Sequence, residues 1–90
     1  MDLRPTRMCD RLIVLVRQVL GPNSSIPEPF PMNAQLNELG LTSLKMVNLM
    51  LAVELEFDIV IPQGDITPEN FRSCATIVAL VERTLVARAP

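Results

Sequence analysis

Residues 38–57 read ELGLTSLKMVNLMLAVELEF, and the rest of the fold is built around this segment. After Gly40 it contains neither glycine nor proline, and hydrophobic residues recur in it at helical spacing. Thr42 or Ser43 can cap the resulting helix, because a hydroxyl oxygen accepts a hydrogen bond from a free backbone N–H in the first turn. We therefore predict a helix from about Ser43 to Phe57, entered through a left-handed or sharply turned Gly40.

The predicted helix is apolar on two sides. One stripe is expected to face the core and consists of Met46, Val47, Met50, Val53 and Phe57. A second stripe is more apolar than a solvent-exposed side should be and consists of Leu44, Asn48, Leu51 and Leu55. Either this second stripe packs against the preceding loop, or it offers a docking surface to a partner.

The segments before residue 38 predict one helix and one long loop. A helical stripe ends at Gly21-Pro22, with Thr6 as the expected N-cap, and consists of Met8, Leu12, Leu15 and Val19. Prolines at positions 22, 27, 29 and 31 exclude a regular helix, so residues 21–42 form a long first loop. Three side chains are expected to attach this loop to the core: Leu36, Leu39 and Leu41.

The segments after residue 57 predict a connector, a short helix and a last long helix. In residues 58–62 the chain is expected to be extended, with Ile59 and Ile61 pointing inward. Thr67-Pro68 is a typical helix start and predicts one short helix. The last helix is capped by Ser73 and has a buried stripe that consists of Ile77, Leu80, Val81 and Leu85. Residues 1–90 are thus predicted to form a single all-α domain, a four-helix bundle of three long helices and one short helix, with its core at about residues 6–87.

Composition and charge exclude several classes of function. The chain is 49% hydrophobic and 20% charged, as expected of a folded domain, but only three residues are aromatic. Few stacking groups and an acidic middle segment argue against a nucleic-acid partner, which needs clustered Lys and Arg. The apolar run at residues 12–16 is too short to span a membrane or to signal secretion. We expect a cytoplasmic monomer in which Cys9 and Cys74 stay reduced.

The segment 38–44, Glu-Leu-Gly-Leu-Thr-Ser-Leu, resembles the attachment motif of acyl and peptidyl carrier proteins. That motif consists of a Leu-Gly pair, a hydrophobic residue, usually an Asp, the modified Ser and a Leu. The resemblance continues through Phe57-Asp58 and the connector, and it covers about residues 6–87. It implies an acyl-carrier-like bundle and a stand-alone carrier, in which Ser43 bears 4'-phosphopantetheine from coenzyme A between Thr42 and Leu44. An acyl or aminoacyl group would be held as a thioester at the end of this arm.

A carrier needs one exposed hydroxyl, and Ser43 at a helix start can supply it. The phosphodiester formed there would lie beside free backbone N–H groups at the positive end of the helix dipole. Later chemistry belongs to the thiol of the arm and to partner enzymes, so a chain without histidine or a metal site is not expected to be an enzyme. Two alternatives stand beside this hypothesis. Ser43 could be an ordinary helix cap, and the chain could be a non-modified helical adaptor that binds a partner through the second stripe.

The resemblance also implies partners: a phosphopantetheinyl transferase, an acyl- or amino-acid-loading ligase, and downstream enzymes of fatty acid or secondary metabolite biosynthesis. The expected partner face consists of Lys45, Asn48, Leu51, Leu55, Glu54 and Glu56. In fatty-acid carriers acidic residues would be common at three of these positions, 45, 48 and 55. Thr42 also stands where Asp is usual. An aminoacyl or specialised acyl carrier is therefore an open alternative, and the sequence does not name the cargo.

Overall fold

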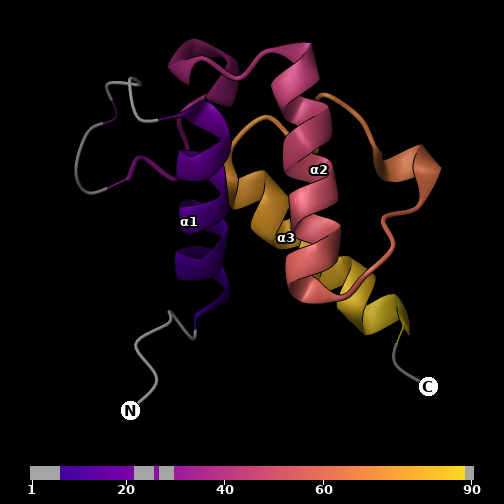
Figure 1. Cartoon of the computed structure of the whole chain (residues 1–90). Coiled ribbons are helices and arrows are strands. Elements are labelled where there is room, and N and C mark those ends of the chain that lie inside the picture. Colours follow the sequence, from indigo (N-terminus) through magenta and orange to yellow (C-terminus); the bar gives the residue numbers. More distant parts are fainter. Residues whose placement is uncertain (1–6, 22–25, 27–29, 89–90) are drawn as a thin grey trace.

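A computed structural model describes residues 7–21, 26 and 30–88. Its elements, in chain order, are α1 (Met8–Leu20), the 3₁₀ turn η1 (Leu36–Leu39), α2 (Ser43–Phe57), the 3₁₀ turn η2 (Gln63–Asp65) and α3 (Cys74–Arg88). Figure 1 shows α1 and α2 side by side, with α3 crossing behind them. The described residues contain no strand, so the predicted all-α fold is confirmed.

The predicted short helix at Thr67-Pro68 is wrong, and the count of four helices is not confirmed. Residues 68–71 form a single turn, in which Thr67 accepts hydrogen bonds from Asn70 N through Oγ1 at 3.2 Å and from Phe71 N through its carbonyl at 3.2 Å. The predicted capping by Thr67 is therefore present without the helix. Phe71, the last residue of this turn, is buried in the core, and so short a segment cannot repay the cost of starting a helix.

Helix α1 begins at Met8 with Arg7 in the cap position, one residue after the predicted cap, and Thr6 lies outside the described residues. Its predicted end is confirmed, since Gly21 adopts φ 95° and donates its N–H to Arg17 O at 3.0 Å. The face that it buries consists of Leu12, Val16 and Leu20. The remaining residues of the predicted stripe, Met8, Leu15 and Val19, pack around this face and are half-buried, and so is Ile13.

The bounds predicted for α2 agree with the structure, but its predicted core face is rotated. The buried residues are Leu49, Val53 and Phe57, of which Leu49 was not among the predicted core residues. Val47, predicted to be buried, is 45% exposed, and Met46 and Met50 are half-buried. Because both sides of the helix are apolar, the sequence offers no polar face from which the rotation could be fixed.

The connector and the last helix follow the prediction. Ile59 and Ile61 are buried, while Val60 between them is exposed. Ser73 and Thr76 cap α3 reciprocally, because Ser73 Oγ accepts from Thr76 N at 3.2 Å and Thr76 Oγ1 accepts from Ser73 N at 3.0 Å. The predicted stripe is buried at Ile77, Leu80 and Val81, and half-buried at Leu85.

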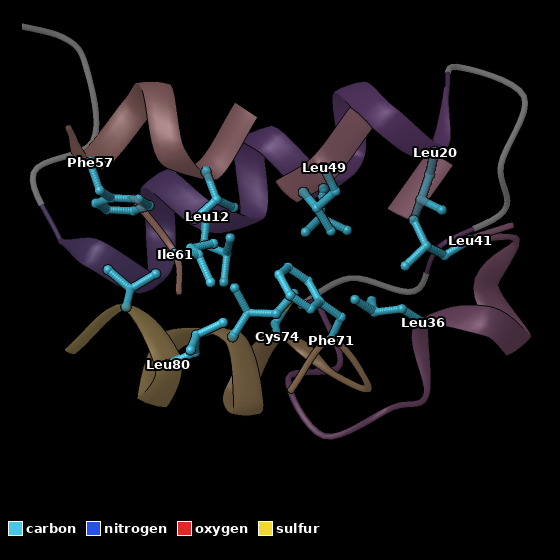
Figure 2. Packing of buried hydrophobic residues seen from close by; sticks show 14 of the residues in the cluster. Leu12, Leu20, Leu36, Leu41, Leu49, Phe57, Ile61, Phe71, Cys74 and Leu80 are labelled. Atoms are coloured by element: carbon cyan, nitrogen blue, oxygen red, sulfur yellow. The ribbon is translucent and has the colours of Figure 1, made fainter. Parts of the chain in front are cut away.

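One core unites the helices and the first loop. Figure 2 shows side chains from α1, α2 and α3 meeting in it, among them Leu12, Leu49 and Leu80. As predicted, the loop is attached by Leu36 and Leu41, which are buried, and by Leu39, which is half-buried. Figure 2 places Leu36 and Leu41 at the end of the core where Leu20 closes α1. This end of the core lies next to the start of α2.

Candidate functional site

A tight turn at Gly40 delivers the chain to the start of α2. Gly40 has φ 108° and ψ 8°, a left-handed conformation that residues with a Cβ adopt only under strain. Its N–H donates to Asn37 O at 3.3 Å, and Leu41 N donates to Leu36 O at 2.9 Å. With Leu41 buried as an anchor, Thr42 and Ser43 emerge at the surface. The predicted turn is confirmed.

Thr42 caps α2 and leaves the neighbouring hydroxyl available. Thr42 Oγ1 accepts a hydrogen bond from Lys45 N at 3.2 Å, and its carbonyl accepts from Met46 N at 2.8 Å. Ser43 is the first helical residue and is exposed, and no hydrogen bond joins its hydroxyl to another described residue. The first turn of α2 contains no acidic side chain, so the positive end of the helix dipole faces Ser43 without a competing anion on the helix itself.

A pocket of about 420 Å³ opens beside Ser43. Three segments form its walls: the chain around η1, the start of α2 and the turn that precedes α3. Backbone hydrogen bonds fix these walls, because Leu36 N donates to Arg72 O at 2.8 Å and Ala75 N donates to Met32 O at 3.0 Å. Among the lining residues, Arg72 carries the positive charge and Glu69 the negative charge. Sequence reasoning missed this pocket, since its walls are far apart along the chain.

The apolar residues of the second stripe of α2 are exposed in the structure. Leu44 is 73% exposed, Leu51 54% and Leu55 86%, and Asn48 is exposed as well. The alternative that these residues pack against the long loop is therefore not supported for the described part of the chain. The stripe leads away from Ser43 along the same helix, so Ser43 and the apolar surface belong to one rigid element.

Lys45, the first charged residue of the expected partner face, makes a contact inside the protein. Its side chain is half-buried, and Nζ donates a hydrogen bond to Leu20 O at 3.3 Å. A cation at this carbonyl interacts favourably with the negative end of the α1 dipole. The contact joins the end of α1 to the start of α2, and so it positions the helix turn that bears Ser43.

The two acidic residues of the expected partner face also bind within the chain. Glu54 Oε2 accepts a hydrogen bond from Ile61 N at 2.8 Å and thereby holds the connector. Glu56 Oε2 forms an ion pair with Arg11 Nε at 2.8 Å, and Arg11 Nη2 donates to Glu56 O at 2.8 Å. The Arg11 guanidinium also lies 4.6 Å from the centre of the Phe57 ring, which adds a cation–π contact. In the sequence, the only indication of these internal contacts was the position of Glu54 and Glu56 at the end of a helix, just before an extended connector.

Both cysteines are free thiols. Cys74 is the first residue of α3 and is buried. Its burial raises the pKa of its thiol to about 12, although the positive charge of Arg17 acts in the opposite direction. Cys9 is half-buried. In the described ranges no cluster of His, Cys, Asp or Glu could hold a metal ion, and no helix is long and apolar enough to cross a membrane.

Comparison with known proteins agrees with this geometry. The model of the phosphopantetheine attachment site matches residues 10–84, which include the whole of α2. The chain belongs to this family of carrier proteins. The carrier is 49% identical over 76 residues to aminoacyl carrier protein 1 of Bradyrhizobium diazoefficiens, which covers 84% of this chain and 83% of the relative. It is 43% identical over 72 residues to aminoacyl carrier protein 2 of that organism, covering 80% of each chain.

Solved structures give the same result. One match is a chain in the crystal structure of the Bradyrhizobium japonicum glycine:[carrier protein] ligase complexed with glycylated carrier protein. The carrier superposes on that chain with a TM-score of 0.66 and 46% identity, and the match covers 82% of this chain and 99% of that chain. A second match comes from the ligase complexed with its cognate carrier protein and an analogue of glycyl adenylate, with a TM-score of 0.65, 44% identity, and coverage of 91% and 100%.

Family membership confirms the function inferred from the sequence. The chain is a carrier protein and not an enzyme, and it holds an acyl or aminoacyl group as a thioester on covalently attached 4'-phosphopantetheine. The residues present fit that group. The start of α2 offers an exposed hydroxyl, a first turn without acidic side chains, and an adjoining pocket. The arm supplies the thiol that forms the thioester.

Proposed function

We propose that this carrier holds an amino acid, with glycine as the first candidate, on a phosphopantetheine arm attached to Ser43. The observation that carries the proposal is that the two neighbouring hydroxyls at the start of α2 have different surroundings. Thr42 accepts the capping hydrogen bond from Lys45 N, while the neighbouring Ser43 hydroxyl is exposed. A hydroxyl used as a cap would have to give up its hydrogen bond before reacting, whereas this one does not.

The similarity to aminoacyl carriers supports the nature of the cargo. Both curated relatives are named aminoacyl carrier proteins, and one solved neighbour is a glycylated carrier protein in complex with its ligase. The sequence of α2 agrees with such a cargo, because Lys45, Asn48 and Leu55 stand where fatty-acid carriers would present acidic residues. We infer that an amino-acid-loading ligase is the partner that charges this chain.

In this proposal the protein contributes position rather than catalysis. The transferase joins Ser43 Oγ to the phosphorus that bears the pantetheine part of coenzyme A. The pyrophosphate P–O bond of coenzyme A breaks, adenosine 3',5'-bisphosphate leaves, and the hydroxyl proton of Ser43 is lost. The resulting phosphodiester lies at the N-terminus of α2, where free N–H groups and the helix dipole favour a negative charge. Thr42 and Leu44 flank the attachment point, and the Lys45–Leu20 hydrogen bond holds the first turn of α2 against α1.

We infer further that partners dock on the exposed side of α2. Leu51 and Leu55, with Asn48 between Ser43 and them, present apolar surface along the helix that carries the arm. Lys45, Glu54 and Glu56 would contribute to the rim of this surface while keeping their internal contacts. The proposal describes a cytoplasmic, monomeric, single-domain carrier that serves the transferase, the ligase and downstream acyl-processing enzymes in turn.

Intact mass spectrometry tests the attachment. After incubation with coenzyme A and a broad-specificity phosphopantetheinyl transferase, the wild-type protein should gain one phosphopantetheine, and fragmentation should place it on Ser43. The Ser43→Ala variant should keep the circular dichroism spectrum of the wild type and gain no mass. Modification of another residue in that variant would show that the assignment is wrong. A non-modified adaptor would gain no mass even as the wild type.

The cargo is tested on the modified protein. Incubation with ATP, a glycine:[carrier protein] ligase and an equimolar mixture of amino acids should add the mass of one glycyl group, which hydroxylamine then releases. Addition of a different amino acid would correct the cargo and leave the attachment site unaffected.

A further inference from the structure

We propose that the connector after α2 is a second interaction surface, which binds an extended, basic segment of a partner protein. The surface lies between residues 58–65 and the last two turns of α3. The partner segment pairs with the main chain of Val60, places an apolar side chain in the pocket beside it, and brings a basic side chain to Asp65. This binding does not depend on the attachment proposed for Ser43.

The main chain of the connector has one paired side and one unpaired side. Ile59 N donates to Glu54 O at 3.0 Å, and Ile61 N donates to Glu54 Oε2 at 2.8 Å, so both N–H groups point toward α2. In an extended chain the N–H groups of successive residues point to opposite sides, so Val60 N–H points away from α2. No described residue forms a hydrogen bond with the N–H or C=O of Val60. Another extended chain can add to such an edge.

A pocket of about 590 Å³ lies beside this edge, between the connector and α3. Its volume is within the range of about 300–1,000 Å³ that is typical of sites for small molecules and single side chains. Three apolar residues line it and are exposed: Val60, Pro62 and Ala87. Val60 alone is 81% exposed, although the two isoleucines beside it are buried. An apolar side chain directly opposite Val60 would cover this surface as a cross-strand pair.

The charges around the pocket favour a basic segment. Two acidic residues, Asp58 and Asp65, line it together with one basic residue, Arg83. Arg83 is engaged within the protein, because its Nη2 donates to Asn70 Oδ1 at 3.3 Å, while Asn70 Nδ2 donates to Asp65 O at 2.8 Å. The carboxylate of Asp65 forms no hydrogen bond or ion pair with a described residue. A Lys or Arg of a partner can therefore pair with Asp65 without displacing an internal contact.

The surface lies at the opposite end of α2 from Ser43. Ser43 is the first residue of this 15-residue helix, and Asp58 follows its last residue. A helix of that length spans about 22 Å. Figure 1 shows the ends of α2 and α3 on the same side of the molecule, away from the start of α2. A protein bound at the connector leaves Ser43 accessible, so the surface suits a partner that holds the carrier in place while other enzymes act on Ser43.

A synthetic peptide tests the inference on the unmodified protein. The probe is the acetylated and amidated heptapeptide Thr-Lys-Thr-Val-Thr-Lys-Thr, whose Val and two Lys side chains share one face when it is extended. Titrated into ¹⁵N-labelled protein, it should cause saturable amide shifts at Val60, Asp65 and Ala87, with a Kd of about 1 mM, and none at Ser43. Asp65→Asn should weaken binding about threefold, the loss of an exposed ion pair. The matched variant Glu38→Gln, near Ser43, should change nothing.

Two further peptides separate the main-chain contribution from the charge contribution. A version that is N-methylated at its three central residues cannot donate to Val60 and should lose binding. A version with Glu in place of both Lys should bind about tenfold more weakly. With the original peptide at saturation, a phosphopantetheinyl transferase should modify the protein at an unchanged rate. The inference would be overturned by the absence of saturable shifts, by equal binding of the N-methylated peptide, by shifts centred on Leu51 and Leu55, or by slower modification.

Discussion

The two apolar sides of α2 are made of the same residue types and have opposite surroundings. Leu49 and Val53 are completely buried in the common core, whereas Leu51 and Leu55 are 54% and 86% exposed. Leucine on the inner side stabilises the fold by removing apolar surface from water. Leucine on the outer side contributes little to folding. Hydrophobicity along α2 therefore stabilises the fold on one side and forms the proposed docking surface on the other, and a sequence pattern alone does not distinguish the two sides.

The charges of α2 add to this contrast. Lys45, Glu54 and Glu56 all make contacts within the protein, with Leu20 O, Ile61 N and Arg11 respectively. The charged residues thus act mainly as internal ties, while the apolar residues are the ones that face outward. This arrangement of charges is the reverse of what is usual for a surface helix. It favours a docking surface that a partner recognises by shape and not by charge.

The largest effect is expected from placing a charge on the inner side. Val53→Asp should unfold much of the domain, because an unpaired charge in a small core costs several kcal/mol, about 3 or more. The matched outer-side variant Leu51→Asp should change the free energy of unfolding by less than about 0.5 kcal/mol. Urea titrations followed by circular dichroism compare the two. Equal destabilisation would mean that the two sides do not differ as described.

A smaller loss of stability is expected at the connector. Glu54→Ala removes the acceptor of the Ile61 N–H, and leaving a part-buried donor unpaired costs about 1–3 kcal/mol. Ligase loading at a temperature where the variant is folded should stay at the wild-type rate. A fall in loading without a fall in the urea midpoint would instead show that Glu54 acts mainly in docking, and not mainly as the support of the connector.

On the outer side we expect an effect on loading without an effect on stability. Leu55→Glu should reduce kcat/KM of the loading ligase about tenfold, because it places a charge on an apolar contact surface. Glu56→Gln serves as the control. It weakens a surface ion pair worth less than about 1 kcal/mol and should leave loading nearly unchanged.

A salt series completes this comparison. Loading should fall only modestly between low and physiological salt, since screening acts mainly on exposed charge pairs. A steep decrease with salt, together with a fully active Leu55→Glu variant, would show that docking is electrostatic.

The smallest effect on stability at neutral pH is expected for Cys74, a buried residue at the start of α3. Because burial raises the Cys74 pKa from 9.0 to about 12, the thiol stays neutral in the folded state over a range in which the unfolded chain ionises. The unfolded state then binds fewer protons, so stability should be unchanged below pH 9 and should fall as the pH rises from about 9 toward 12. Urea titrations of wild type and Cys74→Ala across this range should diverge. Parallel curves would contradict the raised pKa.

Local signals in the sequence predicted the local parts of this structure. The cap at Thr42 or Ser43, the span of α2, the left-handed or sharply turned Gly40, and the inward Ile59 and Ile61 all depend on neighbours within a few residues, and the structure places the cap at Thr42. The exposed Ser43 hydroxyl belongs to the same group, because capping by the preceding residue settles its surroundings. These are the features for which backbone chemistry and side-chain type are sufficient.

What the sequence could not supply depends on distant segments. The rotation of α2, which buries Leu49 and exposes Val47, is set by packing against α1 and against the common core. The short helix predicted at Thr67 does not form because Phe71 is drawn into the core. The pocket at Ser43 requires the hydrogen bond between Leu36 N and Arg72 O, which no local sequence pattern predicts.

The hydrogen bonds that build this pocket also set an order of events during protein synthesis. Leu36 must reach Arg72, and Met32 must reach Ala75, so the walls close only after residue 75 has left the ribosome. The serine and its helix emerge much earlier, but such sequence-distant contacts form late because the intervening chain must first be ordered. The pocket beside Ser43 is therefore completed later in folding than the helix that bears Ser43.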